Sequence, residues 1–237
     1  MRNALVTGVS RRAGIGFAIA HRLEEAGAQV FTQGWTPHDA AQPWGADEGF
    51  APSLEADFAD PVAPARVVAA AREALGTLDV LVVNHARSGH RRLSELIAEE
   101  LDAFLHENVR ASLLLVKEFA AQFEGDHGRV VLLTSGAHKG PMTREVAYAV
   151  SKGALAVATA TLAEELAERS ITVNCVNPGP AETGWGLAEL EPKPRMPFGR
   201  WGEPDDAARL VAWLCSEDGR WITGQVIDSE GGFRRSA

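Results

Sequence analysis

The chain has 237 residues, 46% of them hydrophobic and 23% charged, as expected for a soluble globular protein large enough to bury a substantial core. Its formal net charge of −9 disfavours nucleic acid or an anionic membrane as a partner of the whole protein, although a local basic patch could still bind a small anion. The only cysteines, Cys175 and Cys215, lack CxxC spacing, so we expect a reducing compartment, no disulfide and no metal site.

The beginning of the chain resembles a strand rather than a signal peptide, because an apolar run starts at Asn3 and ends in glycine at Gly8. No apolar run approaches the ~20 residues needed to cross a bilayer. We therefore expect a cytoplasmic protein with neither a membrane nor a nucleic-acid partner.

Short β-branched apolar runs alternate with segments of helical periodicity. In chain order they predict a strand at 4–8, a helix at 15–27, strands at 29–32 and near 54–56, a helix at 64–76, a strand at 79–84, a helix at 94–123, a strand at 129–135, a helix at 148–170, a strand at 172–179, a helix at 205–218 and a strand at 224–229. Gly27 and Gly76 occupy expected helix C-cap positions. This alternation predicts an α/β fold with a parallel sheet and right-handed crossovers.

Nothing in the chain suggests a domain boundary, since it has no internal repeat, low-complexity tract or linker. We expect a single domain over 1–237. The Gly- and Pro-rich stretches at 34–52 and 176–204 predict long loops. The second follows a strand, at the sheet edge where ligands bind in such folds, and we expect 180–203 to cover the substrate.

The stretch TGVSRRAGIG, residues 7–16, places three glycines and two arginines between the first strand and the first helix. Glycine allows a sharp bend and a close approach to the backbone. Free amides at a helix N-terminus attract anions, and arginines strengthen that attraction. The alternative is a surface turn that binds nothing, because the spacing is not GxGxxG.

The stretch YAVSK places Tyr148 and Lys152 four residues apart on one face of a helix. A nearby ammonium group lowers the pKa of a phenol, which makes it a better acid–base catalyst near neutral pH. Ser135, at the end of a strand, adds a hydroxyl at the same sheet edge. Taken singly, each of these is as well explained by a structural tyrosine or a turn serine.

Together, the motifs resemble the short-chain dehydrogenase/reductase family, in particular bacterial 3-oxoacyl-[acyl-carrier-protein] reductase-like members. The resemblance runs nearly end to end and is carried by TGVSRRAGIG, LEADFAD, LVVNHA, ENVRA, Ser135, YAVSK, NPGPAET and the tail MPFGRWGEPDDAARLVAWLCSED…ITGQVIDSEGG. It implies a Rossmann-type doubly wound parallel sheet of about seven strands with helices on both faces.

The resemblance also implies roles for individual residues. Tyr148 is the expected acid in reduction and base in oxidation, and Lys152 is expected to lower its pKa and bind the nicotinamide ribose. Ser135 is expected to orient the carbonyl, and Asn108 to kink its helix and hold a proton-relay water. The expected cofactor-binding residues are Gly8, Ser10, Arg11, Arg12, Gly14, Ile15, Gly16, Asp57, Phe58, Asn84, Ala86, Tyr148, Lys152, Pro178, Gly179, Ala181 and Thr183.

Three departures from the family pattern alter the expected cofactor cradle without removing a catalytic group. The glycine turn is two residues longer than TGxxxGIG, NHAR replaces NNAG, and Ala181 replaces a larger aliphatic residue. We therefore still expect an active enzyme.

The second strand, QVFTQGWT, carries no acid at its end to grip a ribose 2′-hydroxyl, so a 2′-phosphate is permitted there. Arg11 and Arg12 could bind that phosphate, although either could instead face solvent. These features predict a preference for NADP(H), and Asp39 keeps NAD(H) open.

The leading hypothesis is an NADP(H)-dependent oxidoreductase that interconverts a carbonyl and a secondary alcohol, with 3-oxoacyl thioesters or similar ketones among its candidate substrates. The alternatives are a lyase or dehalogenase on the same fold and a non-enzymatic dinucleotide-binding subunit. Trp185, Leu187 and Met196 are candidate substrate contacts. His85, His90, His138, Arg144 and Glu145 could also lie near the site. The apolar helices at 94–123 and 148–170 favour a homotetramer, or a homodimer.

Overall fold

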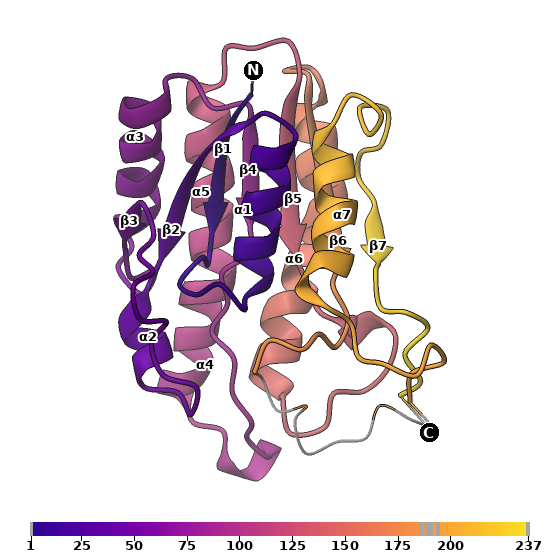
Figure 1. The fold of residues 1–237 in the computed structure, drawn as a ribbon. Coiled ribbons are helices and arrows are strands. Elements are labelled where there is room, and N and C mark those ends of the chain that lie inside the picture. Colours follow the sequence, from indigo (N-terminus) through magenta and orange to yellow (C-terminus); the bar gives the residue numbers. More distant parts are fainter. Residues whose placement is uncertain (1, 185–186, 188–191, 193–194, 236–237) are drawn as a thin grey trace.

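The computed structural model describes residues 2–184, 187, 192 and 195–235, which form one sheet with helices on both faces (Figure 1). The strands are β1 (Asn3–Thr7), β2 (Gln29–Gly34), β3 (Leu54–Glu55), β4 (Val80–Val83), β5 (Gly128–Leu133), β6 (Ile171–Asn177) and β7 (Val226–Asp228). All pairings are parallel, in the order β3-β2-β1-β4-β5-β6-β7. The predicted Rossmann-type fold is confirmed.

The helices are α1 (Ile15–Glu25), α2 (Thr36–Ala40), α3 (Ala63–Leu75), α4 (Ala98–Phe104), α5 (Ala111–Gln122), α6 (Val146–Ala167) and α7 (Pro204–Cys215). Gly27 and Gly76 follow α1 and α3 with φ of +86° each, the left-handed conformation expected just past a helix end.

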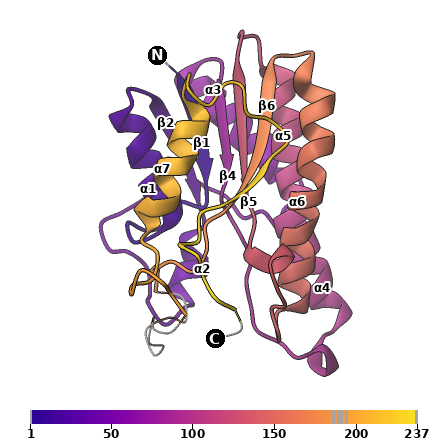
Figure 2. The same cartoon turned by 90° about the vertical axis from the view of Figure 1, so that its right-hand side faces the viewer.

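Alternating side chains of the strands build two hydrophobic cores, because successive residues of a strand face opposite sides of the sheet. On one side, Ala4 and Val6 of β1 pack with α1 and α7. On the other, Leu5 packs with α3, α5 and α6. Figure 2 shows α1 and α7 on one side of the sheet and α5 and α6 on the other. Burial on both faces explains why the strands are continuous apolar runs.

The predicted helix at 94–123 is interrupted. A π-helical segment, Leu105–Arg110, separates α4 from α5, and a short 3₁₀ turn, Leu93–Glu95, precedes them. Asn108 lies inside the π-helical segment and is fully buried. At Asn108 the helix is thus locally widened into a π-helical turn, a form that often marks functional sites. A second difference is α2, which forms within the predicted loop at 34–52.

The expectation that no apolar segment is long enough to span a bilayer is wrong for α6. This helix has 22 residues with a mean hydropathy of 1.4. Its inner face packs against β6 and buries Ser151, Lys152 and Leu155, so α6 is part of the α/β layers, and one such helix is weak evidence for a membrane span. Its outer face explains the high hydropathy, since Val150 and Val157 are exposed there.

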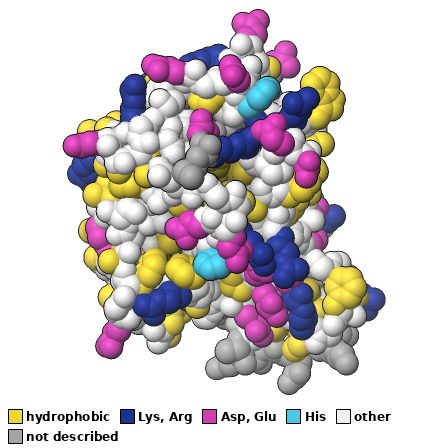
Figure 3. Space-filling model, turned by 45° about the horizontal axis from the view of Figure 1, so that its top comes forward, with side chains coloured by type: hydrophobic (Ala, Val, Ile, Leu, Met, Phe, Trp, Pro, Cys, Tyr) yellow, Lys and Arg dark blue, Asp and Glu magenta, His cyan; other side chains and the backbone are white. Residues whose placement is uncertain are grey.

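The surface carries both signs of charge. Figure 3 shows acidic and basic side chains interspersed on the visible face, over the described residues. The catalytic candidates lie at the carboxyl edge of the sheet, the end to which the strand arrowheads point in Figure 1. Loops after β1, β4, β5 and β6 meet at this carboxyl edge, the usual ligand-binding edge of such sheets.

Candidate active site

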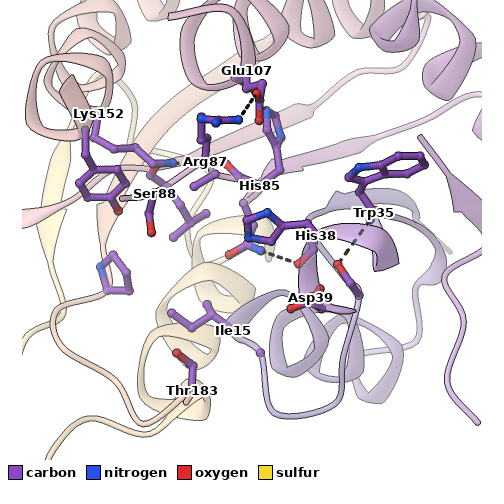
Figure 4. Close-up of a pocket in the computed structure, with 18 of the residues that line it drawn as sticks. Ile15, Trp35, His38, Asp39, His85, Arg87, Ser88, Glu107, Lys152 and Thr183 are labelled. Carbon is purple, nitrogen blue, oxygen red and sulfur yellow. Dashed lines mark hydrogen bonds and ion pairs between the residues drawn. The ribbon is translucent and has the colours of Figure 1, made fainter. Parts of the chain in front are cut away.

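A cavity of about 590 Å³ opens at the carboxyl edge of the sheet and is lined by loops from most of its strands. The glycine turn after β1 borders one part, and Tyr148 and Lys152 of α6 border another. Figure 4 shows Lys152 and Ser88 on one side of the cavity and Trp35 and Asp39 on the other. All the predicted cofactor-binding residues line the cavity except Arg12 and Gly16.

The glycine turn brings backbone close to backbone. Gly8 has φ of +71°, and a Cβ there would lie 2.7 Å from Cα of His85. A Cβ on Gly16 would lie 2.5 Å from the carbonyl oxygen of Gly8. Gly16 thus allows α1 to begin directly beside the end of β1. Its role is therefore to shape the turn, and it does not itself line the cavity. Gly14, the N-cap of α1, provides no side-chain cap, so the first amides of this helix are available to an anion.

The two arginines of the turn have different environments. Arg11 lines the cavity, and only 12% of its side chain is exposed. Its Nε lies 3.1 Å from Oδ1 of Asp39, and its guanidinium stacks 4.6 Å from the ring centre of Trp44. The indole Nε1 of Trp44 donates to the same carboxylate oxygen at 2.9 Å. Burial lowers the pKa of Arg11, and Asp39 opposes that change. Arg11 is therefore held rigidly at the cavity wall.

Arg12 points away from the cavity, contrary to the predicted pair of phosphate-binding arginines. Its Nη1 lies 2.9 Å from Oδ1 of Asp47, and half of its side chain (52%) is exposed. Its backbone amide donates to Asp47 at 2.7 Å. Arg12 therefore stabilises the loop over the turn, and Arg11 is the arginine of this turn that lines the cavity.

Burial acts on both members of the tyrosine–lysine pair. Burial, and secondarily the Glu145 carboxylate, raises the pKa of Tyr148 to about 12. Burial lowers the pKa of Lys152 to about 8. The protein alone thus does not produce the lowered tyrosine pKa expected from the sequence. The phenol is protonated at neutral pH, which is the form that donates a proton.

Lys152 is fixed by two backbone carbonyls. Its Nζ donates to Leu133 O at 2.9 Å and to His85 O at 3.3 Å. Its own carbonyl accepts from Oγ1 of Thr134 at 2.7 Å. These bonds connect α6 to the ends of β4 and β5, which places the ammonium group at the centre of the carboxyl edge.

Neither Ser135 nor Asn108 is among the residues that line the cavity. Ser135 is buried, and its Oγ donates to Sδ of Met142 at 3.6 Å. Met142 itself lines the cavity. Asn108 accepts from the backbone amide of Arg87 at 2.7 Å and donates to Oγ of Ser151 at 2.9 Å. Asn108 therefore joins the loop after β4 to α6.

Comparison with known proteins decides the family. A family model described as enoyl-(acyl carrier protein) reductase matches residues 8–234. The uncharacterized oxidoreductase YjdA of Bacillus subtilis is 38% identical over 247 residues, which cover 98% of this chain and 96% of that protein. A short chain dehydrogenase of Burkholderia cenocepacia, solved in complex with NADP, is 36% identical with a TM-score of 0.85 and covers 98% of this chain and 97% of its own.

The chain belongs to the short-chain dehydrogenase/reductase family. It is thus an oxidoreductase of this family, as the resemblance predicted. The angucycline C-6 ketoreductase LanV, solved with bound NADP, is also similar, at 32% identity and a TM-score of 0.84 over 98% of this chain and 95% of that one.

This short-chain dehydrogenase/reductase has NHAR, residues 84–87, in place of the family's NNAG. In the structure, both ring nitrogens of His85 have hydrogen-bond partners. Nδ1 of His85 lies 2.9 Å from Oγ1 of Thr7, and Nε2 lies 3.0 Å from the carbonyl oxygen of Glu107. Nε2 therefore carries the proton, and the threonine hydroxyl donates to Nδ1. Burial lowers the pKa of His85 to about 3, so the imidazole is neutral.

Arg87, also in NHAR, lines the cavity, and sequence reasoning had not assigned it a role. Its Nη1 lies 2.7 Å from Oε1 of Glu107, the contact dashed in Figure 4. Only its position within a motif that departs from the family could have drawn attention to it.

The remaining candidate substrate-site residues differ in whether they line the cavity. His85, His90, Glu145 and Leu187 line the cavity. His138 instead pairs with Asp228, and neither Arg144 nor the buried Met196 lines it. Trp185 and part of the predicted substrate loop at 180–203 lie outside the described residues. Among the described residues, no group of three or more His, Cys, Asp or Glu side chains could hold a metal ion.

Proposed function

We propose that the protein is an NADP(H)-dependent enzyme that interconverts a carbonyl and a secondary alcohol, with Tyr148 as the proton donor in reduction and acceptor in oxidation. One observation carries the proposal: a single cavity joins the glycine turn to Tyr148 and Lys152. A dinucleotide bound along it would place its phosphates at the start of α1 and its nicotinamide beside the tyrosine.

The residues present fit such a cofactor. At Gly8 and Gly16 a side chain would collide with neighbouring backbone, so only glycine allows the turn to be this tight. The first backbone amides of α1 have no side-chain cap. Asn84 stabilises the turn by donating from Nδ2 to the carbonyl oxygen of Gly8 at 3.0 Å. The adenosine end would meet Asp57, Phe58 and Ala86, and the nicotinamide end Pro178, Gly179 and Thr183, all of which line the cavity.

A preference for NADP(H) is supported by the end of β2. The end of β2 carries Gln33, which is buried and donates from its side-chain amide to Ala56 O at 2.7 Å, rather than an acid that would repel a 2′-phosphate. Arg11 supplies a fixed positive charge at the cavity wall. Asp39 beside it reduces that charge. The similar proteins solved with bound NADP agree with this preference.

When bound, the reduced nicotinamide supplies the hydride for the carbonyl carbon. The Tyr148 hydroxyl donates its proton to the carbonyl oxygen, where negative charge develops. The Lys152 ammonium stabilises the phenolate that this transfer leaves. Ser135 donates a hydrogen bond to the same oxygen once its hydroxyl turns from Met142. Asn108 fixes the loop after β4 against α6. Ketones and 3-oxoacyl thioesters are the substrates to test first.

The test is oxidation of NADPH in the presence of simple ketones and 3-oxoesters. Tyr148→Phe is expected to lower kcat at least ~100-fold, because it removes a general acid. NADPH should still bind to this variant, as measured by quenching of tryptophan fluorescence, because the glycine turn and Lys152 are unchanged. Unchanged turnover in Tyr148→Phe, or no binding of either pyridine nucleotide by the unmodified protein, would refute the proposal. Binding without turnover would favour a binding subunit, or a lyase or dehalogenase.

A further inference from the structure

The C-terminal segment returns to the catalytic edge of the sheet. The chain leaves β7 at Asp228 and continues beside the loop that follows β5, which carries Ser135. In Figure 1 the chain that follows β7 continues to the arrowhead end of the sheet. The tail residues have no part in the proposed proton transfer, so their contacts require a separate explanation.

Arg235 and Glu230 form an ion pair at this position. Nη2 of Arg235 lies 2.7 Å from Oε2 of Glu230, and Nη1 lies 3.1 Å from Oε1, a two-bond geometry. Only 17% of the arginine side chain and 7% of the glutamate side chain are exposed. The hydrogen bond from Arg235 lowers the pKa of Glu230, which keeps the carboxylate charged. Such a shielded pair fixes its geometry more firmly than an exposed pair does.

Two glycines of the Ser135 loop provide the space for Arg235. A Cβ on Gly136 would collide with Nη2 of the arginine, and a Cβ on Gly140 would lie 2.7 Å from its Cδ. Neither glycine has a positive φ, so backbone conformation does not require glycine at these positions. The space that a Cβ would occupy at each position is filled instead by the Arg235 side chain.

The same C-terminal segment holds the loop at a second point. The Asp228 carboxylate lies 3.0 Å from Nε2 of His138 and 3.2 Å from Nζ of Lys139. It also accepts from Nδ2 of Asn177 at 2.8 Å. The loop between Ser135 and Met142 is therefore tied to the C-terminal segment at both its beginning and its middle.

Asn177 extends these contacts to the loop after β6. Its Nδ2 also donates to Oε2 of Glu230 at 2.9 Å, and its Oδ1 accepts from the amide of Gly179 at 3.1 Å. Gly179 has φ of +66°, and a Cβ there would lie 2.5 Å from Cβ of Glu230. Glu230 thus packs directly against a residue expected to flank the nicotinamide.

We propose that Arg235 is a positioning residue. Its side chain pairs with Glu230 and packs against Gly136 and Gly140, and it thereby fixes the position of the Ser135 loop relative to the Pro178–Gly179 turn. This role rests on the proposed function, because register between these loops matters only if the carbonyl lies between them. Arg235 acts through the loops and touches neither reactant. Misplacement of a reacting group by about 1 Å can lower a rate ~100-fold.

The experiment compares Arg235→Ala with Arg234→Ala. Arg234 is a matched control because it is an exposed neighbouring arginine whose side chain makes no hydrogen bond or ion pair with the part of the chain that the structure describes. Arg235→Ala should lower kcat by about tenfold or more, with the NADPH Kd unchanged. Arg234→Ala should match the unmodified protein. Arg235→Lys should recover part of the lost rate, because it restores a positive charge beside Glu230.

A double-mutant cycle tests the contact between Arg235 and Gly136. Gly136→Ala should displace the arginine and lower kcat by a factor similar to that of Arg235→Ala. Adding Gly136→Ala to Arg235→Ala should cost little more, because the colliding side chain is gone. Independent, multiplicative losses would overturn the proposal, as would full activity in Arg235→Ala.

Hydrogen–deuterium exchange separates failure of this proposal from failure of the proposed function. Arg235→Ala should speed exchange in residues 136–142 and leave residues 11–16 unchanged, whether or not the assay substrates are turned over. Faster exchange in a protein that turns over no carbonyl would uphold the contact and refute the function. Unchanged exchange in 136–142 would refute the role of Arg235. Equal acceleration throughout the chain, with a lower Tm, would also refute it, because the pair would then only stabilise the fold.

Discussion

At the residue scale, burial moves Tyr148 and Lys152 towards their neutral forms. The pKa of Tyr148 rises to about 12, so the phenol keeps its proton throughout the physiological range. The pKa of Lys152 falls to about 8, so its charge is lost within an accessible range. Lysine, and not tyrosine, is therefore the group of the pair whose titration an assay can detect in the free protein.

The first prediction concerns pH. In carbonyl reduction, kcat/KM for NADPH should be level below about pH 7 and fall as pH rises through about 8, because Lys152 loses its positive charge there. Lys152→Arg should remove this fall up to about pH 10, since a guanidinium stays protonated. A profile that stays level to about pH 10 in the unmodified protein would contradict the assignment.

His85 gives a prediction about stability. Its folded-state pKa of about 3 lies below the ordinary 6.5, so the unfolded chain takes up the proton first as pH falls. The His85 contribution is thus fully present above about pH 6.5 and is lost at about 1.4 kcal/mol per pH unit between 6.5 and 3. His85→Asn should be less stable than the unmodified protein at about pH 7.5, by ~1–3 kcal/mol for the lost buried hydrogen bonds.

The measurement for His85 is urea unfolding at about pH 7.5 and about pH 5. The stability difference between the two proteins should shrink at the lower pH, because only the unmodified protein pays the cost of keeping a neutral histidine. An equal difference at both values would show that His85 is not the group responsible.

At the element scale, the turn between β1 and α1 places the adjacent residues Arg11 and Arg12 in different environments. The segment after β2 folds over this turn and offers each arginine a carboxylate, Asp39 to Arg11 and Asp47 to Arg12. Only the Arg11 pair lines the cavity. Two neighbouring residues of the same type thus have different environments because they leave the turn in different directions.

Cofactor preference should follow this difference. Arg11→Ala is expected to raise the KM for NADPH by about tenfold or more while changing the KM for NADH little, because it removes a charge-assisted bond to the 2′-phosphate. Arg12→Ala is the matched control and should change neither KM by more than about twofold, since its bonds are to Asp47 at an exposed site. A larger effect of Arg12→Ala than of Arg11→Ala would reverse the assignment.

At the scale of the whole molecule, two groups of exposed apolar side chains lie on separate parts of the surface. On α5 and α6 they are Leu113, Val146, Val150 and Val157, the last 80% exposed. Near α7 and β7 they are Trp213, Trp221 and Val226, with Trp221 92% exposed. Two such surfaces would support two kinds of subunit contact, as in the homotetramer that we propose.

The substitution Val157→Glu tests this assembly. It should produce a smaller species in size-exclusion chromatography with light scattering, because it places a charge in an apolar contact. Val62→Glu is the control, since Val62 is also an exposed valine but lies at the start of α3, away from both surfaces. A monomeric unmodified protein, or an unchanged assembly in Val157→Glu, would contradict the homotetramer.

Local sequence patterns determined much of this protein. The apolar runs of β1, β4, β5 and β6 specify a parallel sheet because strands buried on both faces need continuous hydrophobic side chains. The spacing of Tyr148 and Lys152 fixes both on one face of α6 whatever else the chain does. The glycines of the first turn could be recognised because a turn between a strand and a helix is built from neighbouring residues.

Tertiary structure alone decided the contacts between distant residues. Arg11 meets Asp39 and Trp44, Lys152 meets the carbonyl oxygens of Leu133 and His85, and Arg235 occupies space left by Gly136 and Gly140. Periodicity reports which way a side chain faces within its own helix or strand, but not which loop will close over it. Those partners, and the pKa changes that burial imposes on Tyr148 and Lys152, arise only when the strands bring their carboxyl ends together.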